Sequence, residues 1–127
     1  MNDYTTLENE ATIAKLEPGM KSVKITFKVI STSEEQSVDS SRPEGAHRVV
    51  DALVGDSTAI VLMPIWNETI DAIKNGETYT LKNGYTGLFK GSLRLHQGKF
   101  GSIAVAEKSI DIVNMHLDMS TKDFSST

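Results

Sequence analysis

The chain has 127 residues, of which 39% are hydrophobic and 24% are charged, and its formal net charge is -4. These values describe one globular domain with a modest core. The net charge argues against a protein that coats duplex DNA through its overall charge. The sequence contains no cysteine, which excludes disulfides and thiolate metal sites.

The sequence offers no signal for a membrane or for secretion. No apolar run approaches the roughly 18 residues that a membrane-spanning helix needs. The N-terminal residues MNDYTTLENEATIAK are polar and acidic, without the hydrophobic segment of a secretory signal. We therefore expect an intracellular protein that has no membrane partner.

The first part of the chain predicts a turn, a strand and a loop. Residues 1–15 lack a clear periodicity and are expected to be a flexible lead-in. Pro18 and Gly19 predict a turn, because proline fixes one backbone angle and glycine accepts a positive φ. Apolar and polar side chains alternate in residues 23–30, which is the pattern of a half-buried strand. The polar, serine-rich residues 31–45 predict a long flexible loop whose acidic side chains would repel phosphate.

Two further strands are predicted over residues 47–54 and 59–66, joined by a tight turn at residues 55–58. Both faces of the second of these strands are apolar, so we expect both to be covered. Pro64 cannot donate a hydrogen bond, which places it at a sheet edge, a bulge or a strand end. Asn67 is then expected to be the N-cap of a short helix of about two turns.

The next elements are strands again. Residues 77–86 predict a fourth strand, and residues 92–97 and 102–107 are expected to pair through the turn between them. Leu93 is expected to point inward, which makes odd-numbered residues the buried ones in that strand. In the strand before it the candidate for burial is Leu88, an even-numbered residue. The alternation of inward and outward side chains must therefore shift by one residue between Leu88 and Leu93. Two glycines bracket this change, which predicts a turn or bulge at the sequence LFK. Phe89 and Lys90 are expected to be exposed there.

The order of these elements predicts the fold. About six short strands, with one short helix between the third and fourth, indicate an all-β protein with a single OB-fold, a five- to six-stranded Greek-key barrel. We expect this domain to span residues 16–112. Residues 113–127 are mostly polar and predict a short C-terminal tail, either a frayed helix or disordered.

A basic stretch over residues 80–100 is the strongest functional signal. It contains no Asp or Glu although the whole chain is acidic. Cations for phosphate, aromatic rings for stacking and glycines that let a strand bend are the parts of a groove for single-stranded nucleic acid. The alternative is a surface hairpin with ordinary hydrophobic residues on its inner side. The cations are Lys82, Lys90, Arg94 and Lys99, and the aromatic residues are Tyr85, Phe89 and Phe100.

Trp66 is the lone tryptophan of the chain and ends the predicted third strand. A tryptophan in this position is more often part of a core than of a ligand platform. The two-residue period of a strand, however, puts Trp66 on the face opposite Ile65, away from the expected core. Trp66, Tyr85 and Phe89 would then form three stacking platforms on one side of the barrel.

No pattern of residues indicates an enzyme, a metal or a cofactor. The three histidines show no ligand spacing. The single Gly-Lys pair, at residues 98–99, is followed by Phe100 where a phosphate-binding loop requires Ser or Thr. No GxSxG nucleophile motif occurs. We therefore predict no catalytic residue, no metal and no cofactor.

The chain resembles, over residues 16–112, the OB-fold single-stranded DNA-binding proteins of archaea. It is also similar to the small subunit of the eukaryotic sensor-of-ssDNA complex and to the OB domains of replication protein A. The resemblance is carried by LEPGMKSVKITFKVIS, DALVGDSTAIVLMPIW and IKNGETYTLKNGYTGLFKGSLRL. Its most specific pieces are the VGD turn, the tryptophan that ends the third strand and the aromatic-x-x-x-Phe-Lys-Gly segment.

The resemblance implies which residues contact DNA. It implies stacking of bases on Trp66, Tyr85 and Phe89. Some members carry a further aromatic residue where this chain has His96, which implies a weaker or pH-dependent fourth contact. Many members have a basic residue at His47, and either it or Arg48 could reach phosphate. The complete set of expected contacts is Trp66, Tyr85, Phe89, Lys90, Arg94, His96, Lys82 and Arg48.

The leading hypothesis is therefore a non-enzymatic binder of single-stranded DNA with little sequence preference, acting in replication, recombination or repair. At most four phosphate contacts, from Lys82, Lys90, Arg94 and Lys99, would give a log-log salt dependence of about -3. Two alternatives stay open, a protein-interaction subunit of a replication or repair complex and a binder of single-stranded RNA. We expect a monomer, in the cytoplasm if the source is archaeal and in the nucleus if it is eukaryotic.

Overall fold

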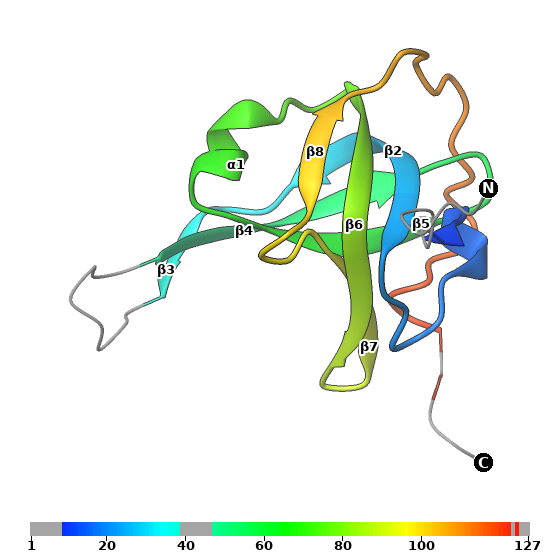
Figure 1. Ribbon diagram of the computed structural model, residues 1–127, viewed down its shortest axis with the longest axis horizontal. Helices are drawn as coiled ribbons and strands as arrows, with labels where there is room; N and C mark the ends of the chain where they lie inside the picture. Colours follow the sequence, from blue (N-terminus) through cyan, green and yellow to red (C-terminus); the bar gives the residue numbers. More distant parts are fainter. Residues whose placement is uncertain (1–8, 39–46, 123, 125–127) are drawn as a thin grey trace, which may run out of the picture.

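The computed structural model describes residues 9–38, 47–122 and 124. In these residues the chain forms one eight-stranded sheet in the order β1-β2-β4-β5-β7-β6-β8, with β3 paired to β4 (Figure 1). No helix in the described part of the chain is long and apolar enough to cross a membrane. The elements are β1 (Asn9–Glu10), η1 (Ile13–Lys15), β2 (Val23–Thr32), β3 (Gln36–Val38), β4 (His47–Gly55), β5 (Ile60–Trp66), α1 (Glu68–Ala72), β6 (Thr78–Phe89), β7 (Ser92–His96) and β8 (Ser102–Val105).

A barrel of five strands closes because β2 pairs with β6 as well as with β4. The circuit runs β2-β4-β5-β7-β6 and back to β2. The strands β5 and β7 run parallel and meet at Leu62 and Arg94. The helix α1 lies between β5 and β6 in the chain, as predicted. The predicted all-β OB-fold is confirmed.

The barrel interior is built by strict alternation of side chains. In β2, Val23, Ile25, Phe27 and Val29 are all buried, and the residues between them are partly exposed. The inward residues of β5 and β7 follow the same rule. Burying each such side chain stabilises the fold by roughly 1.5 to 3 kcal/mol. This core holds in place the outward-facing residues of the same strands. The expectation that both faces of β5 are covered is wrong, because Leu62 and Pro64 are only partly buried and Trp66 is exposed.

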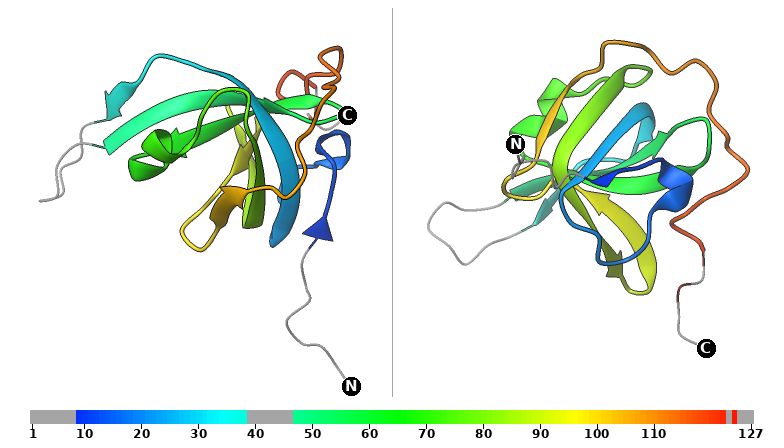
Figure 2. Two further views of the ribbon diagram at one scale, coloured as in Figure 1. Left: turned by 90° about the horizontal axis from the view of Figure 1, so that it is seen from above. Right: turned by 45° about the vertical axis from the view of Figure 1, so that its right-hand side comes forward.

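Segments at both ends of the chain also pack on the barrel. β1 pairs in parallel with β2, and Ile13 of η1 is fully buried. Near the C-terminus, Met119 is buried, and its N–H donates to the carbonyl of Ile60 over 2.8 Å. Figure 2 shows that the segment after β8 runs along the outside of the barrel. The expectation of a flexible lead-in is therefore wrong for residues 9–15. The expectation of a frayed or disordered tail is wrong around Met119. The domain limits at residues 16 and 112 stay a prediction.

Asp56, in the tight turn between β4 and β5, explains how the N-terminal segment is attached. Its Oδ1 accepts from the N–H groups of Thr58 and Ala59 over 2.8 and 3.1 Å, and from the Thr58 hydroxyl over 2.6 Å. Its Oδ2 accepts from the N–H of Ile13 over 2.9 Å. The buried carboxylate therefore closes its own turn and holds η1 against the barrel.

Two predicted connections are wrong. The predicted loop over residues 31–45 contains β3, which pairs with β4, and its first residues extend β2. Residues 39–46, with Arg42, lie outside the described residues. The predicted hairpin of β7 with β8 does not form, because β8 pairs with β6 instead. β7 already has β6 and β5 as neighbours, and the 12-residue β6 is long enough to pair with β7 and β8 in succession.

The helix α1 is shorter than predicted and begins differently. It has five residues, and Asn67 makes no side-chain cap bond to it. Asn67 has a φ of 51°, and its Oδ1 accepts from the N–H of Arg48 over 3.0 Å. Its side chain therefore ties the end of β5 to the start of β4 rather than capping the helix.

The hairpin between β6 and β7 projects below the barrel in Figure 1. Lys90 and Gly91 form its tip with φ values of 51° and 82°, the backbone that favours tight two-residue hairpins. The predicted turn is confirmed here, and Phe89 is 57% exposed, as expected. The expected burial of Leu88 is wrong, because β6 continues past the barrel and leaves Leu88 49% exposed.

Candidate nucleic-acid interface

A groove of about 390 Å³ lies between the β3–β4 hairpin and the β6–β7 hairpin, beside the end of β5. Val38 and Val49 line it from the first hairpin, and Phe89 and Arg94 line it from the second. Trp66 of β5 lies in the same lining. We call this hollow the Trp66 groove. It brings together residues that are far apart in the sequence.

A second groove of about 340 Å³ adjoins it, and we call it the Tyr85 groove. Trp66 and His96 line both grooves, and Tyr85 joins them only in the second. Trp66 is 45% exposed, Tyr85 42% and Phe89 57%, so each ring keeps an accessible surface. The two grooves thus form one continuous surface, the aromatic surface, made by Trp66, Tyr85, Phe89 and His96.

His96 is part of this surface through its contact with Tyr85. The two residues face each other across β6 and β7, with ring centroids 4.7 Å apart and planes 16° from parallel. Each ring therefore covers one face of the other. Tyr85 and His96 form one composite platform rather than the two separate ones that the sequence suggested.

Two cations lie beside Phe89. The Lys90 Nζ is 5.4 Å from the ring centroid, and the Arg94 guanidinium carbon is 5.7 Å from it. Both distances are within the range of a cation–π interaction. Arg94 also donates a hydrogen bond to the Ser92 hydroxyl, which orients its side chain along β7. A ring and two positive charges therefore meet at the β6–β7 hairpin.

Arg48, in contrast, is already paired. Its Nε donates to Glu35 Oε2 over 2.9 Å, and its Nη2 donates to Glu35 Oε1 over 3.1 Å and to Asp71 Oδ1 over 3.0 Å. Hydrogen bonds from Arg48 lower the pKa of both carboxyls, and the same bonds to Glu35 and Asp71 raise the pKa of Arg48. The guanidinium links the segment before β3 to α1 and has little capacity left for another anion.

The remaining predicted residues lie outside the grooves. Lys82 is exposed on β6 opposite Ser102 of β8 and lines neither the Trp66 groove nor the Tyr85 groove. His47 Nδ1 lies 3.2 Å from the side-chain nitrogen of Asn67. The sequence therefore predicted the rings of the surface better than the cations around it.

The wall formed by the β3–β4 hairpin was missed. Gln36, Val38, Val49 and Asp51 line the Trp66 groove, but the segment that holds Gln36 and Val38 was predicted to be a loop. A three-residue strand gives too short an alternation to detect. The sequence signal for this strand was Val38, because β-branched residues are enriched in strands. In the structure Val38 is 43% exposed.

The protonation of His96 should affect stability. Burial, with a smaller contribution from Arg94, lowers the pKa of His96 below its ordinary value of 6.5. The unfolded chain then binds a proton at higher pH than the folded chain, so the free energy of unfolding falls as the pH drops below about 6.5. We expect the His96→Gln variant to lose less stability than the wild type between pH 7.5 and 5.5 in urea denaturation. His116→Gln, at an exposed site, is the control; equal losses in all three proteins would contradict this role of His96.

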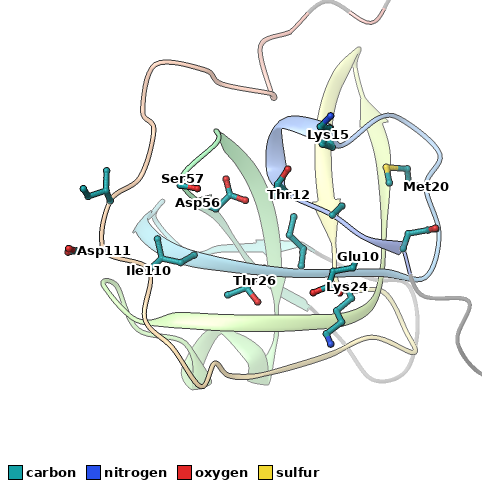
Figure 3. A pocket seen from close by; sticks show the side chains of 14 residues that line it. Glu10, Thr12, Lys15, Met20, Lys24, Thr26, Asp56, Ser57, Ile110 and Asp111 are labelled. Atoms are coloured by element: carbon teal, nitrogen blue, oxygen red, sulfur yellow. The ribbon is translucent and has the colours of Figure 1, made fainter.

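A larger hollow lies elsewhere and has a different character. It has a volume of about 1130 Å³ and is lined by the N-terminal segment, β2, the turn at Asp56 and residues 110–112 (Figure 3). Its lining mixes acidic residues such as Glu10 with basic residues such as Lys24, and contains no aromatic side chain. It lacks the aromatic rings on which the bases of a single strand stack.

Comparison with known proteins identifies relatives of this chain. A family model described as "Single-stranded DNA binding protein Ssb-like, OB fold" matches residues 16–105. The single-stranded DNA binding protein Ssb of Saccharolobus solfataricus is 31% identical over 99 residues, which cover 78% of this chain and 66% of that protein. The chain spans about two thirds of the length of the curated relatives it matches.

Solved structures give the same architecture. The solution structure of a hypothetical protein from Arabidopsis thaliana is 29% identical, with a TM-score of 0.77, and the match covers 92% of this chain and 86% of that one. A replication protein A heterotrimer bound to ssDNA is 14% identical, with a TM-score of 0.67, covering 82% of this chain and 27% of that one. This second match concerns the fold alone.

Proposed function

Because the chain belongs to the Ssb-like family of OB-fold single-stranded DNA binding proteins, we propose that it binds single-stranded DNA and is not an enzyme. The family model covers most of the chain. The observation that carries the proposal is the aromatic surface, in which Trp66, Phe89 and the Tyr85–His96 pair surround two adjoining grooves.

Base stacking supplies most of the affinity in this proposal. A base on an aromatic ring contributes roughly 1 to 3 kcal/mol, as measured by alanine substitution. Every base has a π face, so such contacts give little sequence preference. The half-exposed rings of Trp66 and Phe89 and the free face of the Tyr85–His96 platform would each receive a base.

Phosphate contacts contribute less. Arg94 lines the Trp66 groove, and Lys90 lies outside the lining but beside the Phe89 ring, so both can meet the backbone of a strand stacked on Phe89. Lys82 lies farther along β6, and Arg48 is held by two carboxylates. Each contact to a single strand adds about -0.7 to the log-log salt slope. We therefore expect the slope of log affinity against log salt concentration to have a magnitude below about 3.

Releasing Arg48 should strengthen the electrostatic part of binding. The Glu35→Gln/Asp71→Asn variant removes both partners of the guanidinium. Arg48 can then contact a phosphate, so we expect the salt slope to become steeper by about 0.7. Oligo-dT affinity measured at several salt concentrations checks this, with Asp111→Asn as a control that removes a distant exposed charge. An unchanged slope in the double variant would show that Arg48 does not reach the strand.

The biological role that fits these contacts is protection of single-stranded DNA during replication, recombination or repair. We propose that the protein acts as a monomer, in the cytoplasm of an archaeon or the nucleus of a eukaryote. The match to the Ssb of S. solfataricus is consistent with that setting.

The proposal is tested by equilibrium binding to three labelled nucleic acids. Fluorescence anisotropy would compare oligo-dT, oligo-U of equal length and a duplex of the same length. Tighter binding of oligo-dT than of the other two supports the proposal. Tighter binding of oligo-U would assign the surface to RNA. No binding to either single strand by the folded protein would contradict the proposal and favour a protein partner for the same face.

A further inference from the structure

The loop between β7 and β8, residues 97–101, lies beside the aromatic surface because of how these strands pair. Both strands pair with β6: β7 pairs with its residues 85–89, and β8 pairs with its residues 79–82. The loop that joins β7 to β8 therefore passes Asn83 of β6. The Asn83 side chain donates to the Phe100 carbonyl over 3.3 Å, and the Gln97 side chain donates to the Gly101 carbonyl over 3.1 Å. The loop is therefore held in place before any ligand binds.

Gly98 brings this loop against Tyr85. Its φ is 75°, and a Cβ at this position would lie 2.9 Å from the Tyr85 ring. Any other residue would therefore push the loop away from the ring. The loop and the Tyr85–His96 platform are consequently neighbours in fixed contact.

A third groove, of about 420 Å³, opens on the other side of Tyr85. Its lining includes Lys21, Tyr85, Lys99 and Phe100, and no Asp or Glu. Phe100 is 77% exposed, more than any other aromatic side chain in the described part of the chain. The Lys99 Nζ lies 5.6 Å from the centroid of the Phe100 ring. The third groove therefore combines an exposed ring with two lysines, just as the β6–β7 hairpin combines Phe89 with two cations.

We propose that the third groove is an additional site for single-stranded nucleic acid, in which Phe100 stacks on a base and Lys21 and Lys99 contact phosphates. The inference rests on the proposed function. It extends that function by assigning a stacking role to Phe100 and a phosphate contact to Lys21, beside Lys99, which the basic stretch already suggested as a phosphate contact. Tyr85 lines both the Tyr85 groove and the third groove, so the two grooves adjoin at this residue and one strand can reach both. The occupant is the next part of the same strand.

The charge and the rigidity of the groove favour this occupant. Two lysines without a carboxylate in the lining complement a phosphate backbone. The side-chain hydrogen bonds of the loop reduce the entropy that is lost when a base stacks on Phe100. Single exposed hydrophobic residues are common on surfaces, but this one lies in a groove lined with cations and another ring.

The experiment is a length series of oligo-dT with the full chain, the Phe100→Ala variant and Ile112→Ala as the control. Ile112 is 75% exposed and lies in the lining of the larger hollow, outside all three grooves. Short oligomers that occupy only the aromatic surface should bind all three proteins equally. Longer oligomers should bind Phe100→Ala about tenfold more weakly than the wild type, because one stacked base is lost.

The lysines provide a second measurement. Lys99→Gln should reduce the magnitude of the salt slope by about 0.7 for long oligomers and leave it unchanged for short ones. If the wild type binds oligo-dT but Phe100→Ala follows the same length dependence, the additional site does not exist and the proposed function stands. If the folded wild type binds no oligomer of any length, both proposals are overturned.

Discussion

We expect the Phe89→Ala variant to bind oligo-dT about 5- to 150-fold more weakly than the wild type. This range corresponds to the roughly 1 to 3 kcal/mol that a base gains by stacking on an aromatic ring. Phe89 is 57% exposed, so its removal leaves the core intact. Lys90 and Arg94 also lose the ring against which they lie. Anisotropy of a labelled oligo-dT measures the change directly.

Leu88 supplies a matched control for this experiment. It precedes Phe89 in β6, is 49% exposed and is absent from the lining of the Trp66 groove. Leu88→Ala therefore removes a similar amount of exposed apolar surface on the same hairpin. We expect its affinity to stay within about twofold of the wild type. Equal losses in the two variants would contradict a specific stacking role for Phe89.

The second large effect concerns stability rather than binding. We expect Asp56→Ala to lower the free energy of unfolding by about 3 kcal/mol, out of the roughly 5 to 15 kcal/mol that small domains possess. The substitution leaves the N–H groups of Ile13, Thr58 and Ala59 without their acceptor, and each unsatisfied buried group costs roughly 1 to 3 kcal/mol. Water can reach some of these N–H groups, so the expected loss is smaller than the sum of the three costs.

Urea denaturation checks this prediction, with Asp111→Ala as the control because Asp111 is exposed. Asp56→Asn should lie between the wild type and Asp56→Ala, since its one amide oxygen can replace only part of the carboxylate. A loss below about 1 kcal/mol for Asp56→Ala would mean that η1 is not held by this carboxylate. The expected larger loss would instead explain the VGD turn by the hydrogen bonds of Asp56 within the fold rather than by contact with a ligand.

The barrel could be predicted because its strands obey a two-residue period. Inward burial of Val61, Met63 and Ile65 places Trp66 on the outside, and the same rule places Leu95 inside and His96 outside. The pairing of β8 with β6 could not be predicted, since the sequence favours the nearest strand through a short turn. The packing of Ile13 and Met119 depends on Asp56 and on the backbone of Ile60, which lie far away in the sequence.

In the candidate site, too, some features could be predicted from the sequence and others depend on the folded chain. Exposed rings at Trp66, Tyr85 and Phe89 follow from strand parity and from the family resemblance. The stacking of Tyr85 on His96 depends on the register of β6 and β7, and the pairing of Arg48 depends on Glu35 and Asp71. Such partners are brought together only by the folded chain. The cations were therefore harder to predict than the rings.

Fluorescence of Trp66 during titration with oligo-dT tests the central claim most directly. Trp66 is the single tryptophan and lines both the Trp66 groove and the Tyr85 groove, so its signal reports only on the aromatic surface. We predict strong quenching at saturation, and for Phe89→Ala the same final quenching at higher oligomer concentration. Binding that leaves the Trp66 fluorescence unchanged would contradict the account, because the strand would then lie on another face of the barrel.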